Sequence, residues 1–338
     1  MIWRFITVNY WLVLLLLAAV LAVLEAFARL YHRIKYLAPF HSKHIGEYPF
    51  AQFLEETDPP LYFRFKKNFR SPMVNLNRFR CRGPEPAPDG QKKRMLVISE
   101  SYMFGVKLLK EEQLWSVILQ RMLDERMPGQ WEVLNAANPG YNTDQHLAMW
   151  RKELKATKPD ILVVGMGGND EAIVSMLGPK WKPGAPWPFK FILALERKSP
   201  WWNKLLNHFC LFFIWRRAKS GHPHSNFPPP KGEIPRRACH ENIKNNYRAL
   251  VQEARDMGAE AACTFYAPAV DFDMDERDKR RVASIQANWQ ETLETRTGLD
   301  LALMKEIRED LCPELELPFI DMHQKFRQEP RRFEMYFD

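Results

Sequence analysis

The chain has 338 residues, of which 46% are hydrophobic and 27% are charged. This is an ordinary globular composition, and the length fits one large domain or two. The net charge of +8 permits nucleic-acid binding, but Lys and Arg are spread along the chain without a clustered basic motif. We therefore expect no nucleic-acid partner, and the basic balance fits a protein near an anionic membrane surface better.

The five cysteines include no Cys-x-x-Cys pair, and their odd number leaves at least one thiol unpaired. No zinc-ligand spacing is present, and His222-Pro223-His224 has no carboxylate or cysteine beside it to complete a metal site. We interpret this tripeptide as loop and expect neither a metal nor a cofactor.

The first apolar segment covers residues 5–24, which carry no charge and are dominated by Leu, Val and Ala. About twenty residues at a rise of 1.5 Å span roughly 30 Å, the thickness of the hydrocarbon layer of a bilayer. We expect an uncleaved transmembrane anchor within residues 1–36, because the apolar run is longer than the usual core of a signal peptide. The alternatives are a signal sequence cleaved near Ala26-Phe27-Ala28 and a buried helix of a soluble domain.

Residues 37–90 are predicted to form a juxtamembrane segment in which prolines interrupt regular structure. Between Phe63 and Arg70, phenylalanines are interleaved with basic residues. This pattern suits contact with anionic lipid headgroups, and it equally suits a solvated strand or loop.

From Lys92 onward, apolar strand patterns alternate with helix patterns, which indicates a parallel sheet covered by helices. The predicted strands are Met95–Ser99, Glu132–Asn135, Ile161–Met166, Ala261–Phe265 and Pro318–Asp321. The predicted helices are Gln113–Arg126, Asp144–Ala156, Asn242–Met257 and Ala283–Thr295.

The alternation is interrupted between about residues 171 and 237, a stretch rich in Pro and Trp. Within it, the 15 residues Trp201–Trp215 are strongly apolar and end in Arg216-Arg217. This length is too short for an ordinary membrane span but suits an interfacial helix. Two interpretations carry equal weight: a lid or membrane-docking helix beside a site, and a helix packed on the sheet.

Small or polar residues follow three of the predicted strands, in the blocks Ser99–Gly105, Asn135–Thr143 and Gly165–Asp170. Open α/β sheets place their ligand sites at the carboxyl ends of parallel strands. A serine at such an end, Ser101, suits the role of nucleophile if a base can reach it. The alternative is an ordinary strand-to-helix turn with Ser101 as the helix cap.

The three blocks resemble those of the SGNH (GDSL-type) hydrolase family, which has a serine in a Gly-Asp-Ser block, a glycine in an Asn-x-(Gly/Ala)-x-x-Gly block and an asparagine in a Gly-x-Asn-Asp block. Ser101, Gly140 and Asn169 take these places in chain order. In addition, Asn75–Gly83 resembles the Asn-x-x-Gly-Phe-Arg-Gly lead-in of membrane-tethered members. The resemblance covers most of residues 75–338. It implies a three-layer α/β/α, flavodoxin-like fold with a parallel sheet, and residues 91–338 as the hydrolase-like domain.

The resemblance also implies a mechanism. Ser101 Oγ would attack an acyl carbonyl, and the backbone N–H groups of Ser101 and Gly140 would form the oxyanion hole with the side-chain amide of Asn169. Asp338 matches the catalytic aspartate of the family. The implied activity is that of an esterase or acyltransferase acting on acyl esters, such as those of a glycan or lipid.

The sequence departs from the family pattern at two places. Ser99-Glu100 replaces the Gly-Asp pair before the serine, and the sequence stops at Asp338, so the Asp-x-x-His block is either truncated or missing. Because serine needs a histidine to take its proton, we expect a weak or inactive hydrolase, with His323 either a substitute base or an ordinary loop histidine. The alternative is a non-catalytic SGNH-like module that binds a glycan, a lipid or a partner protein.

The orientation in the membrane follows from two opposing signals. Arg29, Arg33 and Lys35 follow the apolar run, which favours a cytoplasmic carboxyl-terminal domain. Tethered members of the family often work outside the cytoplasm, and we therefore expect an extracytoplasmic domain on a single-pass anchor.

Overall fold

The computed structural model describes residues 2–36, 50–72, 74–105, 110–186, 232–265 and 302–327. Several predicted features lie outside these residues, namely the helix at 283–295, the apolar stretch at 201–215, His222, His224 and Asp338.

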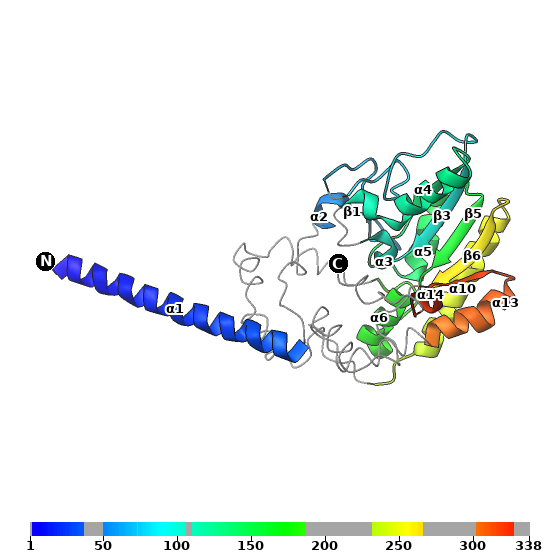
Figure 1. The fold of residues 1–338 in the computed structure, drawn as a ribbon. Helices are drawn as coiled ribbons and strands as arrows, with labels where there is room; N and C mark the ends of the chain where they lie inside the picture. Colours follow the sequence, from blue (N-terminus) through cyan, green and yellow to red (C-terminus); the bar gives the residue numbers. More distant parts are fainter. Residues whose placement is uncertain are drawn as a thin grey trace.

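The first described element is one continuous helix, α1 (Ile2–Tyr36), drawn in blue in Figure 1. Its stretch Tyr10–Tyr31 is long and apolar enough to span a membrane or to be a signal sequence. The large apolar side chains along it, such as Leu15 at 66% exposure, are open to their surroundings.

A five-stranded parallel sheet forms the centre of the fold, with the strand order β4-β3-β5-β6-β7. Its strands are β3 Lys93–Ser99, β4 Trp131–Asn135, β5 Ile161–Gly165, β6 Glu260–Phe265 and β7 Phe319–Asp321. The predicted strands are thus confirmed, with small differences at their ends. A separate antiparallel pair joins β1 Leu54–Glu56 to β2 Phe63–Phe65.

The helices of the described residues include four longer ones besides α1: α4 Trp115–Arg126, α5 Thr143–Lys152, α6 Gly168–Leu177 and α10 Arg236–Arg255. The short ones are α2 Phe50–Phe53, α3 Ser101–Phe104, α13 Cys312–Glu314 and α14 Met322–Arg327, with 3-10 turns at Glu111–Gln113, Leu154–Thr157 and Gly178–Lys180 and a π-helical turn at Ile307–Leu311.

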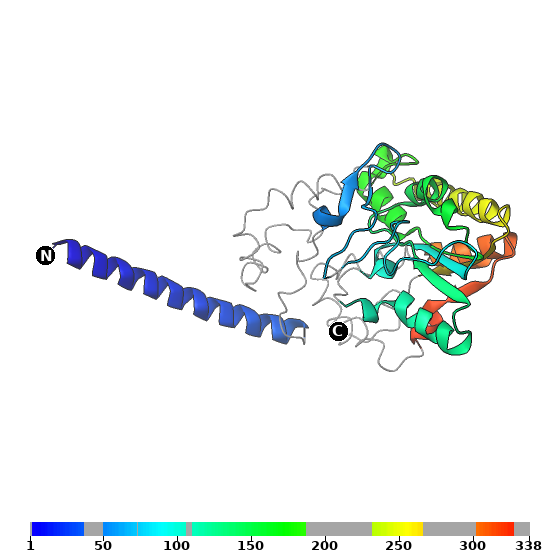
Figure 2. The same ribbon diagram turned by 90° about the horizontal axis from the view of Figure 1, so that it is seen from above.

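Alternate residues of β3 face opposite sides of the sheet and give the fold its layers. Leu96 and Ile98 join the large core that also holds Trp150 of α5 and Leu250 of α10, whereas Val97 belongs to a smaller cluster on the other face. Figure 2 shows α4 on one side of the sheet and α5 and α10 on the other. The chain therefore has the three-layer α/β/α fold that the sequence predicts.

Two helix predictions are wrong at one end. The helix predicted over Asp144–Ala156 ends at Lys152, because Glu153 leaves helical geometry with φ −133°. The Glu153 carboxylate pairs with Arg64 and Lys67 at 2.9 and 2.8 Å. The helix predicted to begin at Asn242 begins six residues earlier at Arg236; its first turns carry charged and polar residues, which hide the hydrophobic period.

The described residues between 50 and 86 pack onto the α/β core. Phe53, Leu61, Phe65 and Leu76 are fully buried within the same core as β3. Their burial stabilises the fold by the hydrophobic effect, about 1.5–3 kcal/mol for each large apolar side chain.

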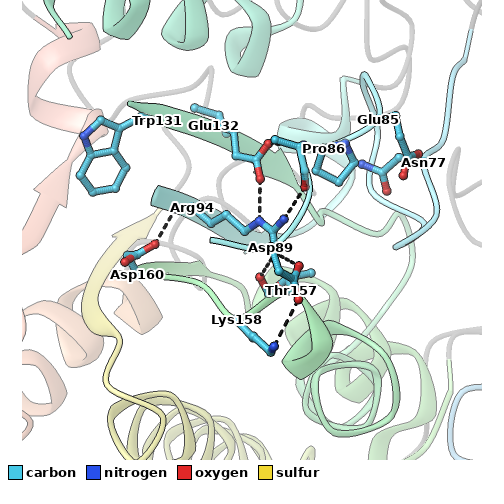
Figure 3. A network of polar contacts seen from close by, with 12 residues as sticks. Asn77, Glu85, Pro86, Asp89, Arg94, Trp131, Glu132, Thr157, Lys158 and Asp160 are labelled. Atoms are coloured by element: carbon cyan, nitrogen blue, oxygen red, sulfur yellow. Dashed lines mark hydrogen bonds and ion pairs between the residues drawn. The ribbon is translucent and has the colours of Figure 1, made fainter. Parts of the chain in front are cut away.

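The amino ends of β3, β4 and β5 are joined by a network of polar contacts around Arg94, which Figure 3 shows. Arg94 donates to Glu132 at 2.5 Å, to Asp89 at 2.8 Å and to the carbonyl of Thr157 at 2.7 Å. Hydrogen bonds from Arg94 and Lys158 hold the pKa of Asp89 below its usual value. The network fixes the approach to β3 at the end of the sheet opposite to Ser101.

Candidate active site

Ser101 lies at the carboxyl end of β3, as the first residue of the one-turn helix α3. Glu100 is the N-cap residue of this helix, so the alternative interpretation of Ser101 as the cap is wrong. Gly105 ends the helix with φ 78°, a left-handed conformation that glycine adopts without steric cost. The Ser101 side chain is therefore held at the start of a very short helix, and Ser101 is partly exposed.

Ser99 fits in place of the glycine of the family because its hydroxyl group has a partner. Ser99 Oγ donates to the carbonyl of Gly165 at 2.5 Å, and the Tyr102 hydroxyl donates to the same carbonyl at 2.7 Å. The carbonyl of Ser99 accepts the N–H of Asn138 at 2.8 Å. The residue is fully buried, and its hydrogen bonds join β3 to β5 and to the loop after β4.

Glu100 joins the end of β3 to the beginning of α6. Its buried carboxylate accepts the backbone N–H of Gly167 at 2.7 Å and that of Asn169 at 3.1 Å. A negative charge is favourable at this position, because the first N–H groups of a helix have no partner within the helix and carry a partial positive charge. The longer side chain of glutamate thus makes a specific contact here.

Asn169 and Gly140 are brought together by a hydrogen bond between their blocks. Asn169 Nδ2 donates to the carbonyl of Tyr141, the residue after Gly140, at 2.9 Å. Gly140 has φ 77°, a conformation that disfavours any residue with a Cβ atom. An amide NH₂ group has two hydrogens, so the Asn169 side chain carries a second N–H besides the one bonded to Tyr141.

Asp170 adds a second link between these blocks. Its buried carboxyl group accepts the backbone N–H and the hydroxyl of Thr143, at 3.0 and 2.8 Å. Burial, and next the nearby charge of Glu100, raise the pKa of Asp170 well above its usual value. Glu100, Asn169 and Asp170 together connect the three strand ends that the sequence singled out.

His146 and His240 are the histidines whose side chains the structure describes. His240 lies in α10 and contacts Glu171 through Nε2 and Glu306 through Nδ1, the latter at 2.8 Å. Burial opposes protonation of His240, but the hydrogen bonds to Glu171 and Glu306 dominate and raise its pKa. No local pattern in the sequence marks this cluster, because its members lie far apart along the chain.

His146 lies in α5, fully buried against the ring of Tyr141 at a centroid distance of 5.4 Å. Burial lowers the pKa of His146 to about 3, so its ring is neutral at physiological pH. Among the described residues, no hydrogen bond joins His146 or His240 to Ser101. His323, expected in a loop or as a substitute base, belongs to α14.

The sequence profile of the GDSL-like lipase/acylhydrolase family matches residues 100–338. No curated protein matches the chain. Similar solved structures include a lipase/acylhydrolase from Enterococcus faecalis, with 14% identity, coverage of 71% of this chain and 81% of that chain, and a TM-score of 0.38. An acetyl xylan esterase, AlAXEase, has 12% identity, coverage of 68% of this chain and 78% of that chain, and a TM-score of 0.34. TesA has 15% identity, coverage of 67% and 77%, and a TM-score of 0.32. Because the family profile matches well over half of the chain, the chain belongs to the GDSL-like lipase/acylhydrolase family.

Proposed function

We propose that the chain is a serine hydrolase of acyl esters with Ser101 as its nucleophile. The observation that supports this best is the hydrogen-bonded connection from Glu100, next to Ser101, to the backbone of Asn169. A serine at a strand end beside a side-chain amide supplies two of the groups that acyl transfer uses, a nucleophile and a donor to the oxyanion.

The proposed oxyanion hole consists of the backbone N–H groups of Ser101 and Gly140 and the amide of Asn169. Donors of this kind stabilise the negative charge that develops on the carbonyl oxygen during attack. The bond from Asn169 Nδ2 to the carbonyl of Tyr141 supports this role, because it fixes the amide beside the Gly140 turn. Asp338, outside the described residues, is proposed as the acid that orients the catalytic base.

A second function is favoured by one observation: neither His146 nor His240 is bonded to Ser101. Within the described part of the chain, then, no histidine is bonded to the serine hydroxyl, which is a poor nucleophile without a base. The second candidate is therefore a non-catalytic module that uses the same edge of the sheet to bind an acyl-bearing glycan, a lipid or a partner protein.

We further propose that α1 is an uncleaved membrane anchor and that the α/β domain lies outside the cytoplasm. The exposed apolar side chains of Tyr10–Tyr31 support the anchor. Substrates near a membrane, such as acyl esters of a lipid or of a surface glycan, fit this placement, and transfer of the acyl group to an acceptor other than water fits it equally. Extraction of the full-length protein from membranes by a carbonate wash would contradict the anchor.

The deciding experiment is covalent labelling of the full-length protein with a fluorophosphonate probe, which reacts only with an activated serine. We expect labelling of the wild-type protein and of Ser175→Ala, a matched change of a partly buried serine in α6, and none of Ser101→Ala. Hydrolysis of a short-chain p-nitrophenyl ester should follow the same order. A folded wild-type protein that is neither labelled nor active would favour the binding module.

A further inference from the structure

The helix that carries Ser101 cannot hold its own position. α3 comprises only the four residues Ser101–Phe104. The last carbonyl groups of any helix lack partners within it, and one isolated turn is unstable because helix nucleation is unfavourable. The orientation of Ser101 must therefore be set by contacts that the rest of the protein makes with α3.

Arg82 makes such contacts at the carboxyl end of α3. Its Nη1 atom donates to the carbonyl of Phe104 at 2.8 Å and to that of Gly105 at 2.7 Å. The guanidinium carbon also lies 4.9 Å from the centre of the Phe104 ring. A positive charge at a helix carboxyl end is favourable, and hydrogen bonds from a charged donor are stronger than neutral ones.

Arg82 is itself fixed to the sheet and has little freedom to move. Its backbone N–H donates to the carbonyl of Asn135 at 2.8 Å, at the end of β4, and Asn135 Nδ2 donates to the carbonyl of Met103 at 2.9 Å. Arg82 is only 2% exposed. The carbonyls of Met103, Phe104 and Gly105 are thus all bonded to Arg82 or Asn135, which are themselves joined by a hydrogen bond.

We propose that Arg82 is a positioning residue for Ser101. It acts on the carboxyl end of α3, while Glu100 acts at the amino end, so that the single turn is held from both sides. The part of this proposal that concerns turnover rests on the proposed function. The part that concerns the rigidity of α3 does not.

Arg80 provides a matched control in the same segment. It is also buried, at 6% exposure, and it joins the segment to the core by pairing with Glu55 at 2.9 Å and Glu153 at 3.3 Å. None of these contacts involves α3. Arg80→Met should therefore remove the ion pairs with Glu55 and Glu153 while leaving the contacts of Arg82 with α3 in place.

The first measurement is hydrogen–deuterium exchange of the backbone of residues 101–105 in the full-length protein. We expect Arg82→Met to speed exchange there by about tenfold or more, because α3 opens without global unfolding, and Arg80→Met to change it by less than about twofold. Equal effects of the two variants, or no effect of Arg82→Met, would overturn the proposal. If Arg82→Met does not fold, Arg82→Lys and Arg82→Gln replace it, with exchange expected to be faster in Arg82→Gln.

The second measurement is the rate of fluorophosphonate labelling and the kcat and KM of ester hydrolysis. A displacement of about 1 Å at the nucleophile lowers the rate by roughly 100-fold, so Arg82→Met should lower kcat with little change in KM. Arg82→Lys should restore part of the lost kcat. Arg80→Met should have the kcat of the wild type at temperatures where both proteins are folded. A folded Arg82→Met with unchanged kcat would overturn the proposal, whereas an inactive wild type would overturn the proposed function and leave the exchange result to decide on Arg82.

Discussion

The carboxylate of Glu100 accepts the backbone N–H of Asn169 at 3.1 Å. The residue before the proposed nucleophile is therefore bonded directly to a residue of the proposed oxyanion hole. This contact joins the end of β3, which carries Ser101, to the beginning of α6, which carries Asn169.

Glu100→Asp is expected to lower activity, although it restores the aspartate of the family pattern. The shorter side chain withdraws the carboxylate by about 1.5 Å, which is too far to keep both bonds to Gly167 and Asn169. Glu100→Gln retains the reach and one acceptor oxygen, so it should retain more activity than Glu100→Asp. Steady-state kinetics of both variants test this, and an aspartate variant as active as the wild type would show that the contact is not needed.

His240 predicts a stability difference that depends on pH. Its folded pKa is raised, with Glu171 and Glu306 at its ring nitrogens and the basic side chains of Arg236 and Lys244 beside these carboxylates. Its contribution is therefore fully present below the unfolded pKa of about 6.5 and is lost as the pH rises through the folded value. The free energies of unfolding of wild type and His240→Gln should differ most at and below pH 6 and converge as the pH rises through the folded pKa of His240. A difference that grows with pH would contradict the ion pairing.

For His146 we expect the opposite dependence of stability on pH. Its folded pKa is lowered to about 3 by burial, so the unfolded chain binds a proton below about pH 6.5 while the folded protein does not. Stability is then lost by up to about 1.4 kcal/mol for each pH unit below that value.

His146→Phe should remove this loss. Neither ring nitrogen of His146 has a hydrogen-bond partner among the described residues, so phenylalanine gives up no such bond and keeps the edge contact with Tyr141. Unfolding by urea at pH 7.5 and pH 4.5 tests this. The free energy of unfolding of the variant should exceed that of the wild type only at the lower pH. An equal shift at both pH values would mean that packing, and not protonation, sets the effect.

The sheet and the grouping of the three site blocks could be predicted because both follow from local patterns. Apolar runs such as Ile161–Val164 fix the strands, and the carboxyl ends of parallel strands share one edge. The contact of Arg82 with Phe104 could not be predicted, since 22 residues separate the two in sequence and nothing near Arg82 marks its partner. For the same reason the cluster around His240 and the early end of α5 at Glu153 depend on tertiary contacts that no local period reveals.

A comparison of Gly140→Ala with Gly129→Ala separates the cost of backbone strain from the proposed role of Gly140 in catalysis. Both glycines have positive φ, 77° and 70°, so alanine at either position should destabilise the fold by roughly 1–2 kcal/mol. Gly129 is an exposed turn residue with nothing within 4 Å of an added Cβ atom, and its variant should keep the activity of the wild type.

Gly140→Ala should lose activity well beyond its loss of stability. Its backbone N–H is proposed to face the oxyanion, and removal or displacement of one such donor lowers kcat by roughly 100- to 1,000-fold. Thermal unfolding gives the melting temperatures of the two variants, and ester hydrolysis measured below the lower of them gives the comparison of activity. If the two alanine variants lose equal activity, Gly140 serves only the turn, and the oxyanion hole must be built from Ser101 and Asn169 without it.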